Sequence, residues 1–108
     1  MAKASDQIAS IIKLYVRELQ KNNIDVKKAI LFGSYARGLA NENSDIDVAI
    51  ISDSLSGNRF DDRRILVPLR RTIDSRIEPM PFKSKDLSRG GNLIDEIKRT
   101  GHHNPLLF

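Results

Sequence analysis

The stretch Ser44–Ile50, which reads Ser-Asp-Ile-Asp-Val-Ala-Ile, constrains the fold of this chain more than any other segment. Within it, the large aliphatic side chains Ile46, Val48 and Ile50 alternate with Asp45, Asp47 and Ala49. Successive side chains of a β-strand point to opposite faces, so residues two apart share a face. The stretch therefore predicts a strand that packs on a core through one face and presents two carboxylates on the other.

Hydrophobic spacing predicts the other elements. They are a helix over 5–21, a buried strand over 26–32, a turn that opens a short helix over 34–39, a second long helix over 59–72, a third strand over 75–82 and a short last helix over 93–101. Residues 52–58 and 83–91 have loop composition. We predict a small α/β (mixed α+β) domain, in which three or more strands form a mixed sheet flanked by helices.

Several residues predict where these elements begin, end or bend. Ser5 is expected to cap the first helix, and the asparagines at 22–23 to end it. Pro68 should kink or interrupt the second helix. Two prolines in the third strand suggest a sheet edge, at Pro79 and Pro81. We expect one domain over 1–108, with 102–108 as a flexible tail.

Composition excludes several classes of chemistry. The chain of 108 residues carries a net charge of +4 and contains no cysteine. Disulfides, cysteine zinc sites and thiol nucleophiles are therefore excluded. No apolar stretch approaches the roughly 20 residues that span a bilayer. No signal-peptide core follows Met1, so we expect a cytoplasmic protein without a membrane partner.

The two aspartates suggest a metal site. Asp45 and Asp47 are expected on one strand face, where their like charges disfavour each other's ionisation. A divalent cation between them would relieve this repulsion, and oxygen ligands suit Mg²⁺. Two aspartates on an ordinary solvated strand face would show the same spacing, so this pair alone does not decide.

The turn after the first predicted strand adds a second feature. Gly33 lets backbone approach a ligand closely, Ser34 supplies a hydroxyl donor, and Arg37 adds a positive charge one helical turn later. Backbone N–H groups at such a strand-to-helix turn bind phosphate. Together with the acidic pair, the turn describes a cradle for a nucleoside triphosphate beside its metal site.

Gly33-Ser34, ten intervening residues and then Asp45-x-Asp47 resemble the signature of the DNA polymerase β nucleotidyltransferase superfamily. The fuller strings Gly-Ser-Tyr-Ala-Arg-Gly and Ser-Asp-Ile-Asp-Val-Ala most resemble its minimal nucleotidyltransferases, which are often found as antitoxins paired with HEPN-domain toxins. The resemblance extends from about Val26 to Gly101.

The resemblance implies a role for each matching residue. Gly33 and Ser34, aided by Arg37, would bind the triphosphate of ATP. Asp45 and Asp47 would bind two Mg²⁺ ions. A third carboxylate on a neighbouring strand would share a metal and help to deprotonate the attacking hydroxyl. Two residues could supply it, the favoured Glu78 and the less favoured Asp74.

The same resemblance implies transfer of AMP from ATP to a tyrosine of a HEPN toxin. Because the chain has little beyond a catalytic core, a partner or a homo-oligomer would complete the acceptor site. Two alternatives stay open: a non-catalytic antitoxin that occludes its partner, and transfer to a small molecule. Arginines over 59–76 indicate a solvated, salt-bridged helix or a face for an acidic partner or nucleic acid. The pair at 102–103, two histidines, is interpreted as incidental.

Overall fold

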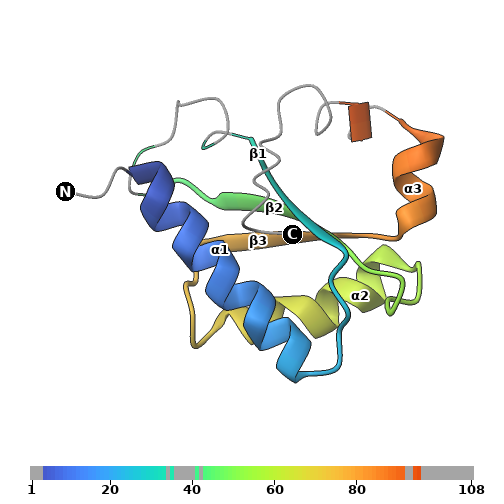
Figure 1. The fold of residues 1–108 in the computed structure, drawn as a ribbon, viewed down its shortest axis with the longest axis horizontal. Helices are drawn as coiled ribbons and strands as arrows, with labels where there is room; N and C mark the ends of the chain where they lie inside the picture. Colours follow the sequence, from blue (N-terminus) through green and yellow to red (C-terminus); the bar gives the residue numbers. More distant parts are fainter. Residues whose placement is uncertain (1–3, 34, 36–40, 42, 92–93, 96–108) are drawn as a thin grey trace.

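The structure is a computed structural model that describes residues 4–33, 35, 41, 43–91 and 94–95 (Figure 1). In chain order its elements are α1 (Ala4–Lys21), β1 (Lys28–Phe32), β2 (Ile46–Ile51), α2 (Arg59–Leu66), the 3₁₀ helix η1 (Val67–Arg70), β3 (Ile77–Phe82) and α3 (Ser84–Arg89). Across the described residues the strands form one sheet in the order β1-β2-β3. β1 pairs antiparallel with β2, and β2 pairs parallel with β3. The predicted mixed sheet flanked by helices is confirmed.

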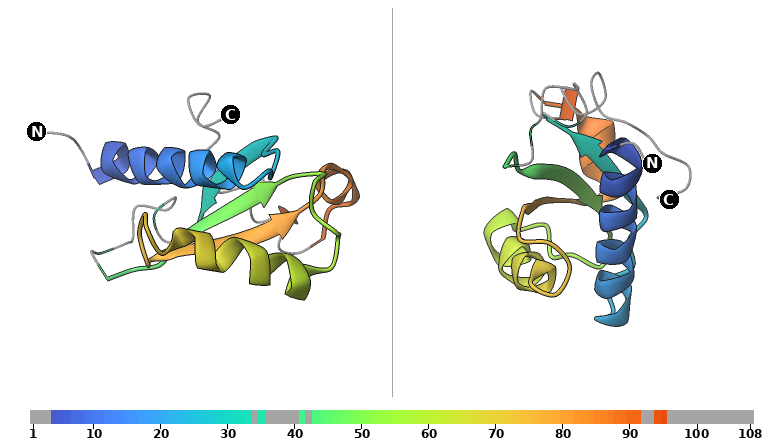
Figure 2. Two further views of the ribbon diagram at one scale, coloured as in Figure 1. Left: turned by 90° about the horizontal axis from the view of Figure 1, so that it is seen from below. Right: turned by 90° about the vertical axis from the view of Figure 1, so that its left-hand side faces the viewer.

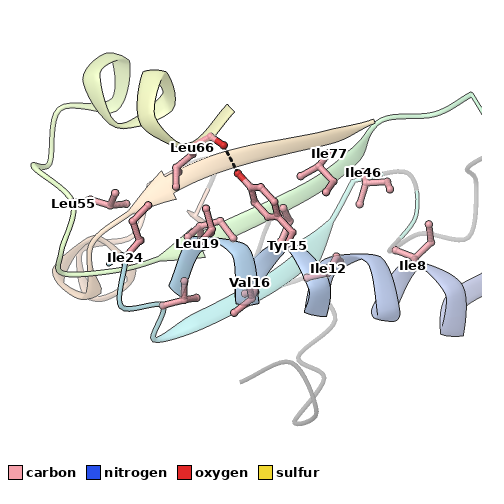
Figure 3. Packing of buried hydrophobic residues seen from close by; sticks show 14 residues of the cluster. Ile8, Ile12, Tyr15, Val16, Leu19, Ile24, Ile46, Leu55, Leu66 and Ile77 are labelled. Carbon is pink, nitrogen blue, oxygen red and sulfur yellow. Dashed lines mark hydrogen bonds between the residues drawn. The ribbon is translucent and has the colours of Figure 1, made fainter. Parts of the chain in front are cut away.

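One face of the sheet packs against α1, which crosses in front of it in Figure 1. Spacing of three and four residues places the apolar side chains of α1 on one stripe, at Ile8, Ile12, Tyr15, Val16 and Leu19. This stripe meets the inward side chains of β2 and β3 and Leu66 of α2 (Figure 3). The Tyr15 hydroxyl donates to the Leu66 carbonyl at 2.6 Å, and burial raises its pKa.

The opposite face of the sheet is apolar over only part of its length. Ile30, Ala49, Ile51 and Phe82 form a second cluster there with Ile94 from beyond α3. Figure 2 shows α3 beside one end of the sheet, where β2 and β3 finish. The other end of this face carries the polar residues described below.

Most boundaries agree with the sequence predictions. Asn23 has a φ of +66° just beyond α1, as a helix-ending asparagine should. Pro68 stands at the start of η1, where α2 gives way to a 3₁₀ turn. β3 pairs with β2 alone among the described strands, so the edge suggested by Pro79 and Pro81 is confirmed.

Two predictions are wrong. The first helix begins at Ala4, so Ser5 lies within its first turn and is not its cap. Residues 83–91 are not a plain loop, because they contain α3. Two aspartates hold the start of that helix, one from its own first turn and one from the segment after β2: Asp86 accepts from the Lys83 backbone N–H at 2.7 Å, and Asp53 accepts from the Ser84 N–H at 2.9 Å.

Other predictions fall on positions outside the described residues. They are the short helix over 34–39, apart from Tyr35, and the tail 102–108. Of the helix predicted over 93–101, only Ile94 and Asp95 are described, and both are helical. Among the helices of the described ranges, none has the length and apolar character that crossing a membrane requires.

Candidate active site

The register of the sheet brings Asp47 and Glu78 together. Asp47 is opposite Phe32 of β1 on one side and opposite Glu78 of β3 on the other. Paired residues on neighbouring strands point to the same face, with strands about 4.8 Å apart. Both side chains are half-buried. The two acids therefore share the polar end of the second sheet face.

Asp45 immediately precedes β2 and is exposed. A compact turn leads the chain into it: the Asn41 N–H donates to Ser44 Oγ at 3.0 Å, and the Ser44 N–H donates to the Asn41 carbonyl at 3.1 Å. The Asn41 side chain also accepts from the Asn43 N–H at 2.8 Å. Such a turn is typical of asparagine and serine and delivers Asp45 to the start of the strand.

Gly33 packs directly against the Asp47 side chain. Its φ of +73° is a conformation that residues with a Cβ rarely adopt. A Cβ at this position would clash with the carboxylate of Asp47 and would lie 3.1 Å from its Cγ. Glycine is thus required here both for the turn and for the close approach of backbone to a carboxylate.

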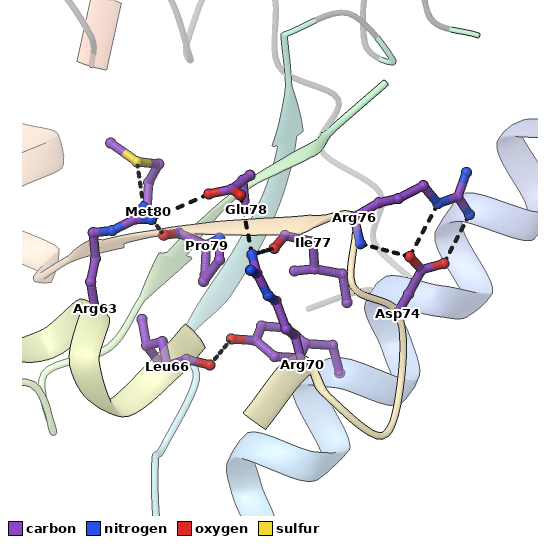
Figure 4. Close-up of polar contacts among 10 residues, drawn as sticks. Arg63, Leu66, Arg70, Asp74, Arg76, Ile77, Glu78, Pro79 and Met80 are labelled. Atoms are coloured by element: carbon purple, nitrogen blue, oxygen red, sulfur yellow. Dashed lines mark hydrogen bonds and ion pairs between the residues drawn. The ribbon is translucent and has the colours of Figure 1, made fainter. Parts of the chain in front are cut away.

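Glu78 is held by two arginines (Figure 4). Arg63 of α2 donates to Glu78 Oε2 at 3.2 Å, and Arg70 of η1 donates to Glu78 Oε1 at 3.1 Å. All three side chains are about one-third exposed or less, at 35% for Arg63, 26% for Arg70 and 31% for Glu78. The geometry fixes both carboxylate oxygens from the side of α2.

The same arginines bind the outer edge of β3. Arg70 donates to the Ile77 carbonyl at 2.7 Å, and Arg63 donates to the Pro79 carbonyl at 2.9 Å. The backbone N–H and C=O groups of the even-numbered residues along β3 point toward β2. Two bonds of 2.8 Å at its ends show this, from Ile46 N–H to the carbonyl of Arg76 and from Ser52 N–H to the carbonyl of Phe82. The odd-numbered carbonyls therefore point outward, where the guanidiniums satisfy them.

Arg76, which immediately precedes β3, forms an ion pair with Asp74 and a hydrogen bond to Tyr35 in the turn after β1. Arg76 donates to Asp74 Oδ2 at 2.8 Å and to the Tyr35 hydroxyl at 3.1 Å, and that hydroxyl donates to the Asn41 carbonyl at 3.0 Å. Hydrogen bonding to Arg76 lowers the pKa of Asp74, and the carboxylate raises the pKa of Arg76. Asp74 is therefore paired with Arg76. Of the two candidates for the third carboxylate, Glu78 is the one that lies beside Asp47.

The predicted site residues are only partly assembled. Asp45, Asp47, Gly33 and Glu78 lie at one end of the sheet, whereas Ser34 and Arg37 fall outside the described residues. Nowhere in the described part of the chain do three or more histidine, aspartate or glutamate side chains gather closely enough to hold a metal ion. Glu78 instead turns toward its two arginines. Its oxygens and those of the aspartates are the ligand type that Mg²⁺ prefers.

Arg63 and Arg70 are the site residues that the sequence interpretation missed. It assigned the arginines of this region to a solvated helix or a partner face. Their spacing of seven residues, two helical turns, would have placed both on one face and was a usable signal.

A cavity of about 360 Å³ lies at the other end of β3. Its lining includes Arg59, Phe82, Lys83 and Arg89, with Arg59 stacked 5.3 Å above the Phe82 ring. None of the three acids lines it, so we distinguish it from the candidate active site.

Comparison with known proteins identifies the class. Residues 10–99 match the model of the nucleotidyltransferase domain, and this chain belongs to that family. Two similar proteins of Methanocaldococcus jannaschii carry the name "putative protein adenylyltransferase". One is 38% identical over 64% of this chain and 50% of its own length, so this chain spans about half of it. The other is 31% identical over 88% of this chain and 96% of its own length.

Two solved structures share the fold. A crystal structure of a toxin–antitoxin with AMP-PNP aligns with a TM-score of 0.58 and 24% identity over 84% of this chain and 70% of that chain. A crystal structure of a "putative nucleotidyltransferase" from Sulfolobus solfataricus aligns with a TM-score of 0.58 and 20% identity, covering 82% of each chain. At this identity the likeness establishes the fold alone.

Replacing Gly33 should disturb the site as well as the fold. We expect G33A to lower the free energy of unfolding by roughly 1–2 kcal/mol for the left-handed backbone, with an added cost for the clash with Asp47. Urea unfolding would measure this. Gly57 is the matched control, because it also has a positive φ but a Cβ there meets only the flexible Lys83 side chain at 3.5 Å. Equal losses in G33A and G57A would contradict the close packing on Asp47.

Arg70 and Glu78 should be energetically coupled. In a double-mutant cycle of R70Q and E78Q, we expect the two losses of unfolding free energy to be non-additive by about 1 kcal/mol. The exposed neighbour Arg71 gives the control, since R71Q and E78Q should simply add. Additivity in both cycles would show that the Arg70–Glu78 bond contributes nothing.

The Asp74–Arg76 pair should give a defined pH dependence. Because the folded-state pKa of Asp74 is depressed, its stabilisation is present above its unfolded value of 3.8 and is lost as pH falls through the lower folded value. We expect D74N to be less stable than wild type by about 1 kcal/mol at pH 7. Chemical denaturation at a series of pH values should show this gap closing below pH 4. A gap that stays constant across the acidic range would refute the assignment.

Proposed function

We propose that this protein is a magnesium-dependent nucleotidyltransferase that moves AMP from ATP to a hydroxyl group on a partner protein. The observation that carries the proposal is the register that sets Asp47 beside Glu78, with Gly33 packed against Asp47. Family membership makes nucleotidyl transfer the chemistry to test first.

The acids fit Mg²⁺ by donor type. Asp45, Asp47 and Glu78 would hold two ions, which would neutralise charge on the nucleotide phosphates and on the leaving pyrophosphate. The close contact of Gly33 with Asp47 supports this assignment, because no side chain of residue 33 can cover that carboxylate. Ser34 and Arg37 are proposed to bind the triphosphate, as the motif implies.

The reaction itself is a direct displacement. The acceptor oxygen would form a bond to the α-phosphorus, the bond from that phosphorus to pyrophosphate would break, and the hydroxyl proton would pass to a carboxylate. Glu78 is the candidate for that proton, since it is the acid that β3, one of the two outer strands of the described sheet, sets beside Asp47. The chain contributes fixed positions and charge, and no covalent enzyme intermediate is needed.

We further propose that the acceptor is a tyrosine of a HEPN toxin, so that the protein acts as an antitoxin. The names of the M. jannaschii relatives support a protein acceptor, and the toxin–antitoxin structure with AMP-PNP supports a toxin partner and an adenine nucleotide.

The D47N substitution tests the proposal. It keeps the shape of the side chain and removes its charge, so we expect nucleotide transfer to fall by roughly 100-fold or more. The measurement is transfer of label from α-³²P-ATP with Mg²⁺ into a lysate of the source cells. D25N is the control, because Asp25 is an exposed carboxylate (69%) paired with Lys27 away from the site.

Discrete labelled protein bands with wild type and D25N, but not with D47N, are the expected result. Label in small molecules alone would instead indicate a small-molecule acceptor. The same assay would be run with α-³²P-labelled GTP, CTP and UTP. No label from any of the four nucleotides, together with toxin neutralisation that survives D47N, would show that the protein neutralises its partner by occlusion and not by catalysis.

A further inference from the structure

The outer face of α2 carries an exposed apolar groove. Its lining, which we call the α2 groove, consists of Phe60, Arg63, Arg64, Val67 and Pro68. The groove is open to solvent and has a volume of about 390 Å³. Phe60 is 72% exposed, which is unusual for a large aromatic side chain. The lining residues recur at three- and four-residue spacing, so they form one stripe along α2 and the start of η1.

The chemistry of the α2 groove is apolar and cationic. Phe60, Val67 and Pro68 supply apolar surface, and the Arg64 guanidinium lies 5.9 Å from the Phe60 ring centroid. The second cation of the lining is Arg63, and no carboxylate is among the described residues that line the groove. Such a surface is complementary to a segment that combines an apolar side chain with acidic residues.

Arg63 connects this groove to the candidate active site. The residue that lines the groove also donates to Glu78 at 3.2 Å and to the Pro79 carbonyl at 2.9 Å. An occupant of the groove would therefore lie within one arginine side chain of the Glu78 carboxylate. A hydroxyl elsewhere on the same occupant would have a short path to the acids.

We propose that the α2 groove docks an acidic, apolar segment of the protein that accepts the nucleotide. This inference rests on the proposed function and names the surface by which the acceptor is recruited. A second copy of this chain is a poorer occupant, because the arginine-rich face of α2 would meet like charge in a chain of net charge +4. Nucleic acid is poorer too, because Phe60 is the one aromatic residue in the lining, whereas single-stranded nucleic acid is held by stacking successive bases on several aromatic side chains.

Two pairs of variants isolate the groove. F60A removes its aromatic wall, and I65A removes a similarly exposed apolar side chain (52%) of α2 that does not line it. R64E reverses a charge in the groove, and R71E makes the same change in net charge at an exposed position outside it. Thermal unfolding of each variant verifies that it is folded.

The probe is a fluorescein-labelled random copolymer of glutamate and tyrosine, with binding followed by fluorescence anisotropy. We expect F60A and R64E to weaken binding by about tenfold or more, and I65A and R71E by no more than about twofold. A lysine–tyrosine copolymer should not bind. Equal losses in R64E and R71E, or failure of the wild-type protein to bind, would overturn the proposal.

Two further outcomes would assign the groove to another occupant. Tighter binding of a single-stranded DNA oligonucleotide with the same dependence on Phe60 would assign it to nucleic acid. A dimer in sedimentation that F60A alone converts to monomer would assign it to a second copy. Copolymer binding that depends on the groove, combined with no nucleotide transfer in the lysate assay described above, would refute the proposed function. The α2 groove would then still be a docking surface for an acidic, apolar segment.

Discussion

The central position of β2 is the constraint on which the site depends. From Val48 to Ile51 both faces of this strand are buried, and it pairs with a strand on each side. A slip of one residue would turn Asp47 into the core and Val48 out of it, at a large cost in burial. The apolar residues therefore hold the register, and the register in turn sets Asp47 against Gly33 and Glu78. The geometry of the acids is thus a consequence of hydrophobic packing a few residues further along the same strand.

Arg63 and Arg70 stabilise the edge of β3 in two ways. Outward-facing carbonyls of an edge strand invite unwanted pairing, and a carboxylate next to another carboxylate is electrostatically unfavourable. Arg63 and Arg70 bind the carbonyls of Pro79 and Ile77 and neutralise Glu78 at the same time. The prolines fit this arrangement because they present no outward N–H. Metal ligation by Glu78, as proposed, would have to compete with these two cations, so the arginines would set how readily that carboxylate is released.

Local patterns predicted those parts of the molecule whose causes are local. The alternation from Asp45 to Ile50 predicts β2, and Pro68 predicts the end of α2. The pairing of Asp47 with Glu78 is a tertiary fact, and only the family resemblance pointed to it. Asp86 and Asp53 capture α3 through bonds to Lys83 and Ser84, and composition alone cannot show such bonds. The seven-residue spacing of Arg63 and Arg70 indicates a shared helix face, but their common partner Glu78 depends on how α2 and η1 pack against β3.

Arg63 contacts both the proposed docking surface, the α2 groove, and the Glu78 carboxylate of the candidate active site. One face of α2 packs into the core through Leu66, while its outer stripe holds Phe60 and Arg64 at the surface. Arg63 lies between these faces and reaches around β3 to Glu78 and the sulfur of Met80. An acidic group bound in the α2 groove would compete with Glu78 for the same guanidinium. Docking would then loosen one of the two restraints on Glu78, so that the carboxylate becomes available when an acceptor is present.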